Sequence, residues 1–224
     1  MKDKEILSIE KYRSDIYRAL SSCYNPPEKG IADVLKRLEA GLCATGSNAI
    51  SQVVMMRNDL NTGVTVDDLK IQFAKLYIGP YKVLAPPFGS VYLDDKHQIM
   101  GESTLDVIKR YSAAGLTVDE GFKNPPDHIS AELEFMHILI IEELNCLHKG
   151  CVDEAVEWLV QQFEFLKSHI GQWVDSFTGL TFQETQMPYF RYLATATQQF
   201  IQEERQWLGE TVADWHTRSE KIAD

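Results

Sequence analysis

One short stretch of the sequence concentrates acidic and imidazole side chains that could do chemistry. The segment "PPDHISAELEFMH" contains Asp127, His128, Glu132, Glu134 and His137. Carboxylates and imidazoles bind transition metals and transfer protons. Glu134 and His137 form one Glu-x-x-His pair, but a di-iron bundle requires two such pairs and further glutamates. We therefore expect no metal or other cofactor, and keep a metal protein or enzyme that uses Glu132, Glu134 and His137 as an alternative.

Common catalytic and nucleotide-binding motifs do not occur in this sequence. "GLCATGS" has the glycine spacing of a phosphate-binding loop but lacks its lysine. No G-x-G-x-x-G follows a predicted strand, and neither H-E-x-x-H nor G-x-S-x-G is present. The sequence therefore favours a protein that binds a partner over an enzyme.

The candidate residues belong to the most apolar predicted helix, which ends at Gly150. At about 100° per residue, Ile129, Leu133 and Met136 fall on one apolar arc, and Glu132 lies inside it. An unpaired acid on an apolar face costs several kcal/mol. Glu132 should therefore have a neighbouring partner, a raised pKa or a ligand.

Two residues mark the start of this helix. Asp127 follows two prolines, and its carboxylate is expected to be the N-cap that accepts bonds from the first turn. His128 is expected in the first turn, where the positive end of the helix favours neutral imidazole.

Apolar residues recur at spacings of three and four along most of the chain, which is typical of amphipathic helices. Thr65 and Asp68 resemble a capping box. A short extended piece is expected at 90–93. The other helices are predicted near 9–20, near 31–38 with a stop at Gly41, and near 47–60, 103–114, 152–168, 170–177 and 187–208. These patterns predict an all-α fold: one domain over 1–224, a helical bundle with two long, ordered, proline-rich loops.

Composition and charge narrow the class of partner. The chain has 224 residues, 44% hydrophobic and 25% charged, which is ordinary for a globular protein. Its formal net charge of -11 argues against nucleic acid and favours a basic peptide or protein surface. No apolar run approaches the ~18 residues of a membrane span. The charged N-terminus is unlike a secretory signal, so a cytoplasmic location is expected.

The sequence contains four cysteines, Cys23, Cys43, Cys146 and Cys151, with neither CxxC nor zinc-ligand spacing. In a reducing compartment, cysteines of this kind are mostly small buried hydrophobes.

The two loops, "APPFGSVYLDD" with its neighbours and "GLTVDEGFKNPPD", are long for a compact helical domain, and loops of that length usually have a function. They carry a resemblance. "LYIGPYKVLAPPFGSVYLDDKHQIMGEST" followed by "NPPDHISAELEFM" resembles the TorD/DmsD family of redox-enzyme maturation chaperones, as does the later "PYFRYL". "PPFGSVYLD" is closest to the DmsD-like branch, which usually has tryptophan where Phe88 stands.

The resemblance implies a cytoplasmic, all-helical chaperone without enzymatic activity. Members of this family bind the twin-arginine signal peptide of a molybdopterin-dependent oxidoreductase and hold the enzyme until its cofactor is loaded and it can be exported. The mature enzyme is a further candidate partner. Some members form domain-swapped dimers, so the chain is expected to be a monomer or such a dimer. Weak guanine-nucleotide binding has also been proposed in the family.

The resemblance assigns residues of the peptide site to the positions of this sequence that match the family's motifs. The polar part is implied at Asp127 and His128, and Glu132 joins them as a nearby acid. Residues 85–95 are expected to form one wall of the site. A core position is an equal alternative for two members of the apolar patch, Phe73 and Leu76, because they lie on a helical stripe. The implied apolar patch consists of Phe73, Leu76, Tyr77, Pro87 and Phe88.

Three readings follow. The leading one is a peptide-binding chaperone, because carboxylates beside an apolar groove suit a basic, then apolar peptide, and carboxylates prefer arginine to lysine. The second is the metal protein or enzyme described above. The third is a helical scaffold that joins subunits of a complex, in which the loops would not affect affinity for a signal peptide.

Overall fold

The computed structural model describes residues 2–79, 82–95, 97–117 and 121–223, with side chains from Ile6 to Trp215 in these ranges. The expected all-α fold is confirmed over these residues, in which no strand is present. The helices are α1 (Lys2–Cys23), α2 (Ile31–Thr45), α3 (Ile50–Asn61), α4 (Val66–Phe73), α5 (Ser90–Leu93), α6 (Glu102–Ala113), α7 (Ile129–Lys149), α8 (Val152–Ser168), α9 (Ile170–Glu184) and α10 (Pro188–Ala223), with a π-helical turn, η1, at Ala74–Ile78.

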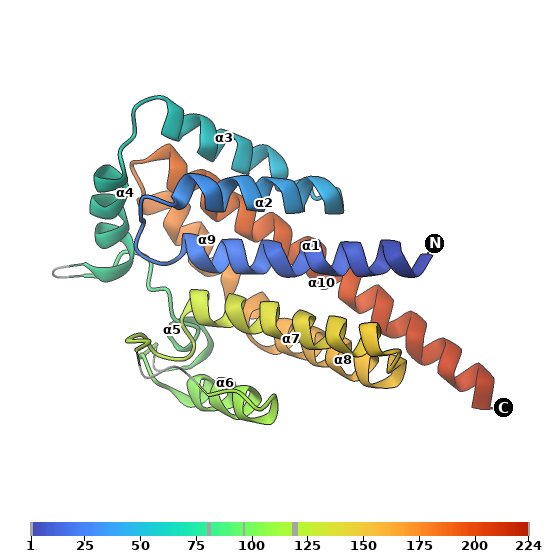
Figure 1. Ribbon diagram of the computed structural model, residues 1–224. Helices are drawn as coiled ribbons and strands as arrows, with labels where there is room; N and C mark the ends of the chain where they lie inside the picture. The colour runs from blue at the N-terminus through green and yellow to red at the C-terminus, as the bar shows by residue number, and fades with distance from the viewer. Residues whose placement is uncertain (1, 80–81, 96, 118–120, 224) are drawn as a thin grey trace.

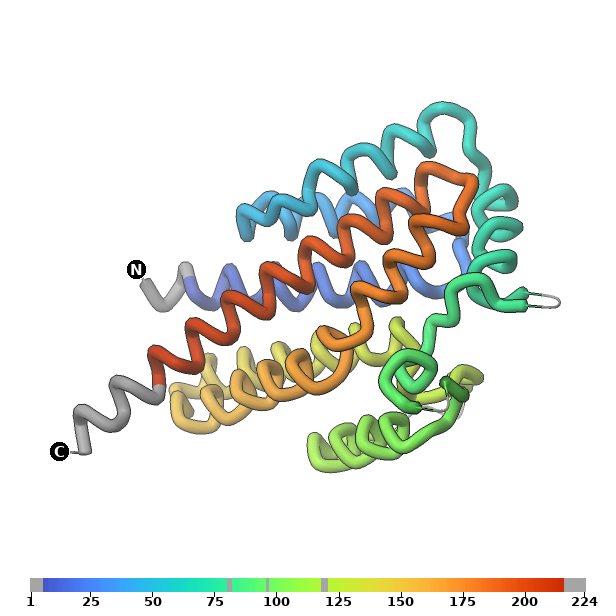
Figure 2. Tube along the Cα trace, turned by 180° about the vertical axis from the view of Figure 1, so that it is seen from behind, coloured from blue at the N-terminus to red at the C-terminus, as the bar shows by residue number. Residues whose placement is uncertain are grey.

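The long helices lie side by side, and the short ones gather at one end of them (Figure 1). Helix α1 packs between α2 and α7, while α10 packs on α3, α8 and α9. Helices α4 and α5 and the two proline-containing loops lie at the end away from both termini, as Figure 1 and the reverse view in Figure 2 show. The loops therefore share one end of the bundle.

Aromatic side chains fill the core beneath the loops. Tyr24, Tyr77 and Phe177 are almost completely buried and lie within ring-contact distance of one another, with centroids 5.4 to 6.1 Å apart. Buried aromatic side chains contribute a large apolar area each, and edge-to-face pairs add to it. This cluster joins α1, η1 and α9 into one core.

Several predicted helix ends are confirmed. Thr65 caps α4 in a capping box with Asp68, and Gly150 ends α7 in the left-handed conformation. The predicted stop at Gly41 is wrong, because α2 continues to a left-handed Gly46. A Cβ on Gly41 would lie 2.7 Å from Ile16 Cγ1, so this glycine permits the close contact of α1 with α2.

Three other expectations are corrected by the structure. Residues 90–93 form the short helix α5 and are not extended, since the backbone N–H groups of Tyr92 and Leu93 both donate to Gly89 O. Helices α9 and α10 run beyond their predicted ends at 177 and 208. Neither extension contains a proline, which is why helical hydrogen bonding continues.

A buried ionic network ties α1 to α7, α8 and α10. The Arg13 guanidinium donates to both Glu204 oxygens at 3.0 and 2.7 Å, and it is paired with Glu10. Gln162 Nε2 donates to Glu143 Oε2 at 2.6 Å beside this pair. Burial, followed by the charge of Glu10, raises the pKa of Glu143 to about 8. Two carboxyls thus pair with one guanidinium, and a third, that of Glu143, is linked to it through Gln162.

Glu143→Gln should flatten the pH dependence of stability. The folded-state pKa of Glu143, about 8, lies above its unfolded value of about 4.3. Its stabilising contribution is therefore complete below the unfolded pKa and is lost as pH rises toward 8, at up to ~1.4 kcal/mol per pH unit. In urea unfolding at pH 5, 6.5 and 8, the stability of Glu143→Gln relative to that of the wild type should increase as the pH rises. Parallel pH dependences for the variant and the wild type would contradict this.

Candidate functional site

The two loops meet at the start of α7. Phe88 and His128 form an isolated antiparallel bridge, in which Gly89 N–H donates to Asp127 O and Ile129 N–H donates to Pro87 O, both at 2.9 Å. We call this region, Pro87 to Gly89 with Asp127 to Ile129, the loop junction. It brings together four residues that the sequence had placed in one site, Pro87, Phe88, Asp127 and His128.

Asp127 lies inside the loop junction. Its side chain is completely buried, and Oδ2 accepts a hydrogen bond of 2.8 Å from Ser90 N–H at the first turn of α5. The prediction that Asp127 is the N-cap of α7 is wrong. The N-cap is His128, whose Nδ1 accepts from Ser130 N–H at 3.1 Å. Asp127 therefore fixes α5 against α7 and presents no free surface.

His128 is neutral, as predicted, but for a different reason. Burial lowers its pKa to about 4, which leaves Nδ1 available as the capping acceptor at neutral pH. Its ring packs edge-on against Phe88 of the first loop at 5.4 Å and against Phe122 of the second at 6.2 Å. His128 thus links both loops to the helix.

Glu132 has the internal partner that its place on the apolar arc required. It is completely buried, and its Oε2 accepts from Trp173 Nε1 of α9 at 3.1 Å. Burial raises the pKa of Glu132 well above its usual range, and the nearby Asp127 charge adds to this effect. A Cβ on Gly89 would lie 3.0 Å from Trp173 Nε1 and 3.2 Å from Glu132 Oε1, so the first loop approaches this pair closely because it has glycine there.

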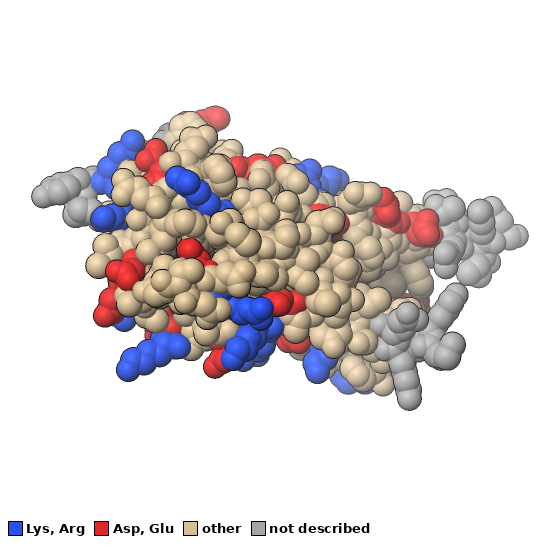
Figure 3. All heavy atoms as spheres, turned by 90° about the horizontal axis from the view of Figure 1, so that it is seen from above, with Lys and Arg blue, Asp and Glu red and all other residues tan. Residues whose placement is uncertain are grey.

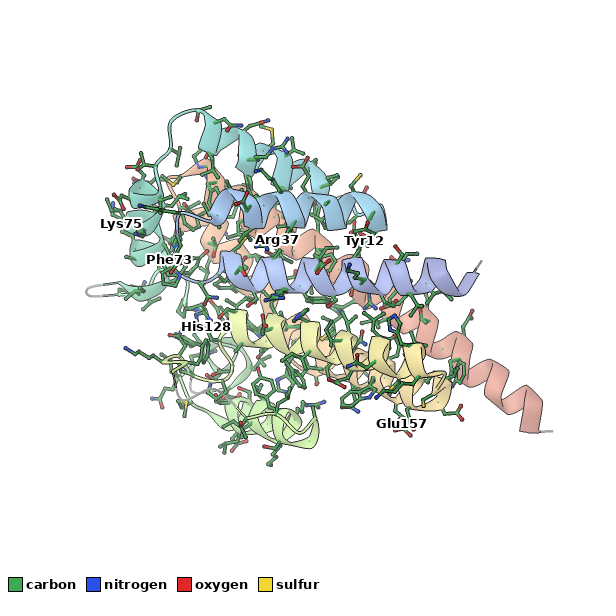
Figure 4. The ribbon with its side chains drawn as sticks, viewed as in Figure 1. Tyr12, Arg37, Phe73, Lys75, His128 and Glu157 are labelled. Carbon is green, nitrogen blue, oxygen red and sulfur yellow. The ribbon has the colours of Figure 1, made fainter. Side chains whose placement is uncertain are left out.

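Phe73, Leu76 and Tyr77 lie in the core. Their exposed fractions are 4%, 0% and 4%, and Tyr77 packs on Phe73 and Phe190 with ring centroids 5.0 and 6.1 Å away. Phe73 on α4 and His128 at the start of α7 occupy the same end of the bundle (Figure 4). Phe73 and Leu76 are therefore core residues, as the alternative interpretation of their helical stripe expected, and they support the loops from beneath.

Beside the loop junction a cavity of about 350 Å³ opens between α1, α6, α7 and the second loop. Its walls are mainly apolar. Among the described lining residues Glu134 carries the one carboxylate, and this side chain is half-buried. The apolar lining consists of Tyr111, Leu116, Phe122, Ala131, Phe135 and Ile138, and the polar lining of Ser21, Asn25, Thr117, Ser130 and Glu134.

Sequence analysis did not identify most of these lining residues. Leu116 and Phe122 come from a loop that has no periodicity, and Tyr111 and Ile138 were expected only as helix residues. One signal was present, because Leu116 and Phe122 are apolar residues in an otherwise polar and proline-rich segment. Positions 118–120 of this loop, and 80, 81 and 96 of the first, lie outside the described residues.

The three residues named in the metal alternative lie in different surroundings. Glu132 faces Trp173, Glu134 lines the cavity, and His137 Nδ1 is hydrogen-bonded to Ser14 Oγ at 2.7 Å. Within the described residues, no group of three or more His, Cys, Asp or Glu side chains could hold a metal ion. The three candidate ligands therefore do not converge.

Surface charge and helix length add two findings. On the face shown in Figure 3, basic and acidic side chains are interspersed, and no continuous basic stripe of the kind that binds nucleic acid crosses its described part. None of the described helices is both long enough and apolar enough to cross a membrane.

A family model called nitrate reductase delta subunit matches residues 44–179, which include the loop junction and most of the cavity lining. The chain belongs to this family. It is 25% identical to the chaperone protein TorD of Shewanella pealeana over 219 residues, covering 91% of this chain and 93% of that protein. The TorD of Vibrio parahaemolyticus is 26% identical over 121 residues, 54% of this chain and 53% of the relative.

Among solved structures, the chain resembles one described as a redox enzyme maturation protein from Archaeoglobus fulgidus. The TM-score is 0.48 with 19% identity, over 88% of this chain and 93% of the other. The family match and the TorD relatives confirm the resemblance to TorD/DmsD chaperones that the loops indicated.

Replacement of His128 separates its capping role from its ring contacts. Both His128→Ala and His128→Asn remove the ring between Phe88 and Phe122, but asparagine is a good N-cap and alanine is not. We expect the alanine variant to be less stable than the asparagine variant by about 1 kcal/mol in urea unfolding at pH 7. Equal stabilities would show that the His128 Nδ1 bond to Ser130 N–H contributes nothing.

Proposed function

We propose that the chain is a cytoplasmic, non-catalytic chaperone for one molybdopterin-dependent oxidoreductase. It binds the twin-arginine signal peptide of that enzyme, assists loading of the cofactor and delays export until loading is complete. Membership of the family and the TorD relatives support a maturation chaperone. The observation that supports peptide binding is the open apolar cavity with a carboxylate in its wall, next to the loop junction.

The chemistry of the cavity matches that of the peptide. A twin-arginine leader is basic at its front and apolar after it. The rings of Tyr111, Phe122 and Phe135 offer apolar surface, and the Glu134 carboxylate offers two oxygens that a guanidinium can bind as a fork. A cavity of about 350 Å³ accommodates a few side chains, so the rest of the peptide lies across the surrounding surface. The net charge of -11 attracts a basic peptide from solution.

In this proposal, the site residues that the resemblance implied hold the two loops in position, and we call them frame residues. Pro87, Phe88, Asp127 and His128 are buried in the loop junction, so they set the positions of both loops instead of meeting the peptide in this conformation. Phe122, which lines the cavity, contacts the His128 ring. Removing a frame residue should therefore lower peptide affinity by loosening a wall of the cavity.

Calorimetric titration with the leader peptides of the host's molybdoenzymes tests the proposal. One leader should bind with micromolar or lower Kd, and its Lys-Lys version should bind at least ten-fold more weakly, because lysine cannot make the fork. Binding to no leader by well-folded protein would contradict the proposal and favour a scaffold.

Variants locate the site on the molecule. Glu134→Gln should weaken leader binding about ten-fold, equivalent to ~1.4 kcal/mol. Glu142→Gln, on the same helix and also half-buried but outside the cavity, should bind like the wild type. Asp127→Ala should likewise bind the leader more weakly than Glu142→Ala, because loss of the Asp127 carboxylate loosens the loop junction. Equal affinities for the Glu134 and Glu142 variants would remove the cavity from the proposal.

A further inference from the structure

A second hollow surface lies at the end of the bundle that holds the termini. One part, of about 640 Å³, lies between α1, α8 and α10, and an adjoining part of about 490 Å³ lies along α8. Trp215 of α10 borders both parts. We call this surface the terminal groove. In Figure 4, Glu157 on its α8 side and His128 at the loop junction lie toward opposite ends of the bundle.

Two helices present regular faces to the terminal groove. On α8, a set of five residues, 153, 156, 157, 160 and 161, lines the smaller part and Leu159 lines the larger one; on α10, a set of five, 207, 210, 211, 214 and 215, lines the larger part, and 215 also borders the smaller one. Each set follows the i, i+3, i+4, i+7, i+8 spacing of a single helix face. At 1.5 Å per residue, each face is about 12 Å long, or a little over two turns. Figure 2 shows the late part of α10 running past the α8 end of the bundle. The two hollows meet at Trp215, and two regular helix faces on either side of this tryptophan form a surface that can receive a third helix.

The floor of the groove is apolar and aromatic. Leu159 is 7% exposed, Ile6 is 50% exposed, and Trp207 and Trp215 are half-buried. The Trp207 ring is held in place by the Arg13 guanidinium, which lies 4.0 Å from its centroid. Tryptophan is enriched among the residues that contribute most of the binding energy at protein interfaces.

Both rims of the groove are acidic. Asp153 and Glu157 are exposed on the α8 face, and Glu210 and Asp214 are exposed on the α10 face, each pair spaced by four residues. The described residues that line the two parts of the groove include no lysine or arginine. A ligand that fits must therefore have an apolar stripe with positive charges on both sides of it.

We propose that the terminal groove binds a basic amphipathic helix of a partner protein. Charge complementarity determines this choice. A second copy that met the groove with the same face would place carboxylate against carboxylate, and an anionic lipid surface would be repelled in the same way. The site lies apart from the cavity proposed for the signal peptide, so both can be occupied at once, and its existence does not depend on the signal-peptide proposal.

Fluorescence anisotropy of labelled model peptides tests this. The probe is an 18-residue Leu/Lys peptide with leucines at helical spacing, compared with a scrambled peptide of the same composition and a Leu/Glu peptide. We expect the amphipathic Leu/Lys peptide to bind with micromolar Kd, the scrambled peptide at least ten-fold more weakly, and the Leu/Glu peptide not at all. Equal binding of the amphipathic and scrambled peptides would overturn the proposal.

Pairs of variants with the same change in charge test where on the protein the Leu/Lys probe binds. Asp153→Asn with Glu157→Gln should raise its Kd at least ten-fold, whereas Asp33→Asn with Asp67→Asn, two exposed acids in first turns elsewhere, should change it less than two-fold. These surface changes avoid the folding risk of Trp215→Ala, which should also weaken binding. Equal effects of the two pairs would show general charge attraction and overturn the proposal.

Two further readouts separate this site from others. Titration of the Asp153/Glu157 variant with a signal peptide should give wild-type affinity, so failure of the signal-peptide proposal is recognised independently. Displacement of the Leu/Lys probe by a signal peptide would overturn the assignment of the groove to a separate partner. Sedimentation that shows a dimer lost on Trp215→Ala would overturn it in favour of a second copy.

Discussion

Burial of the Asp127 carboxylate is the constraint on which the loop end of the molecule depends. A carboxylate that is completely removed from water must be hydrogen-bonded, and Asp127 accepts the N–H of Ser90 from the other loop. This bond holds α5 against the start of α7 and brings Gly89 close to Glu132 and Trp173. Because His128 then contacts both Phe88 and Phe122, the wall of the open cavity is fixed from the same point.

Periodicity and local capping predicted the helices where local sequence determines them. The bounds of α8, the Thr65 cap and the left-handed Gly150 were all predictable, since each depends on residues within one or two turns. The helix at 90–93 was not, because its first N–H is satisfied by Asp127, 37 residues away. Gly41 was misread as a stop for the same reason, since its role is set by Ile16 on another helix.

The sequence predicted which segments form the site, but not which side chains contact one another there. The sequence indicates that Glu132 lies on an apolar face, but it does not show that Trp173 is the donor that satisfies it. The residues carried over by resemblance, including Phe88 and His128, do meet, yet they meet as interior side chains. The open surface beside them comes from Glu134 and from loop residues such as Phe122, whose positions depend on tertiary packing.

Hydrogen–deuterium exchange with and without a bound twin-arginine leader tests the central claim, that the cavity beside the loop junction holds the peptide. The account predicts slower exchange in the second loop, at 115–117 and 121–126, with no change along α2 and α3. Protection confined to the terminal groove or to α2 and α3, with exchange in the second loop unchanged under saturating peptide, would contradict it.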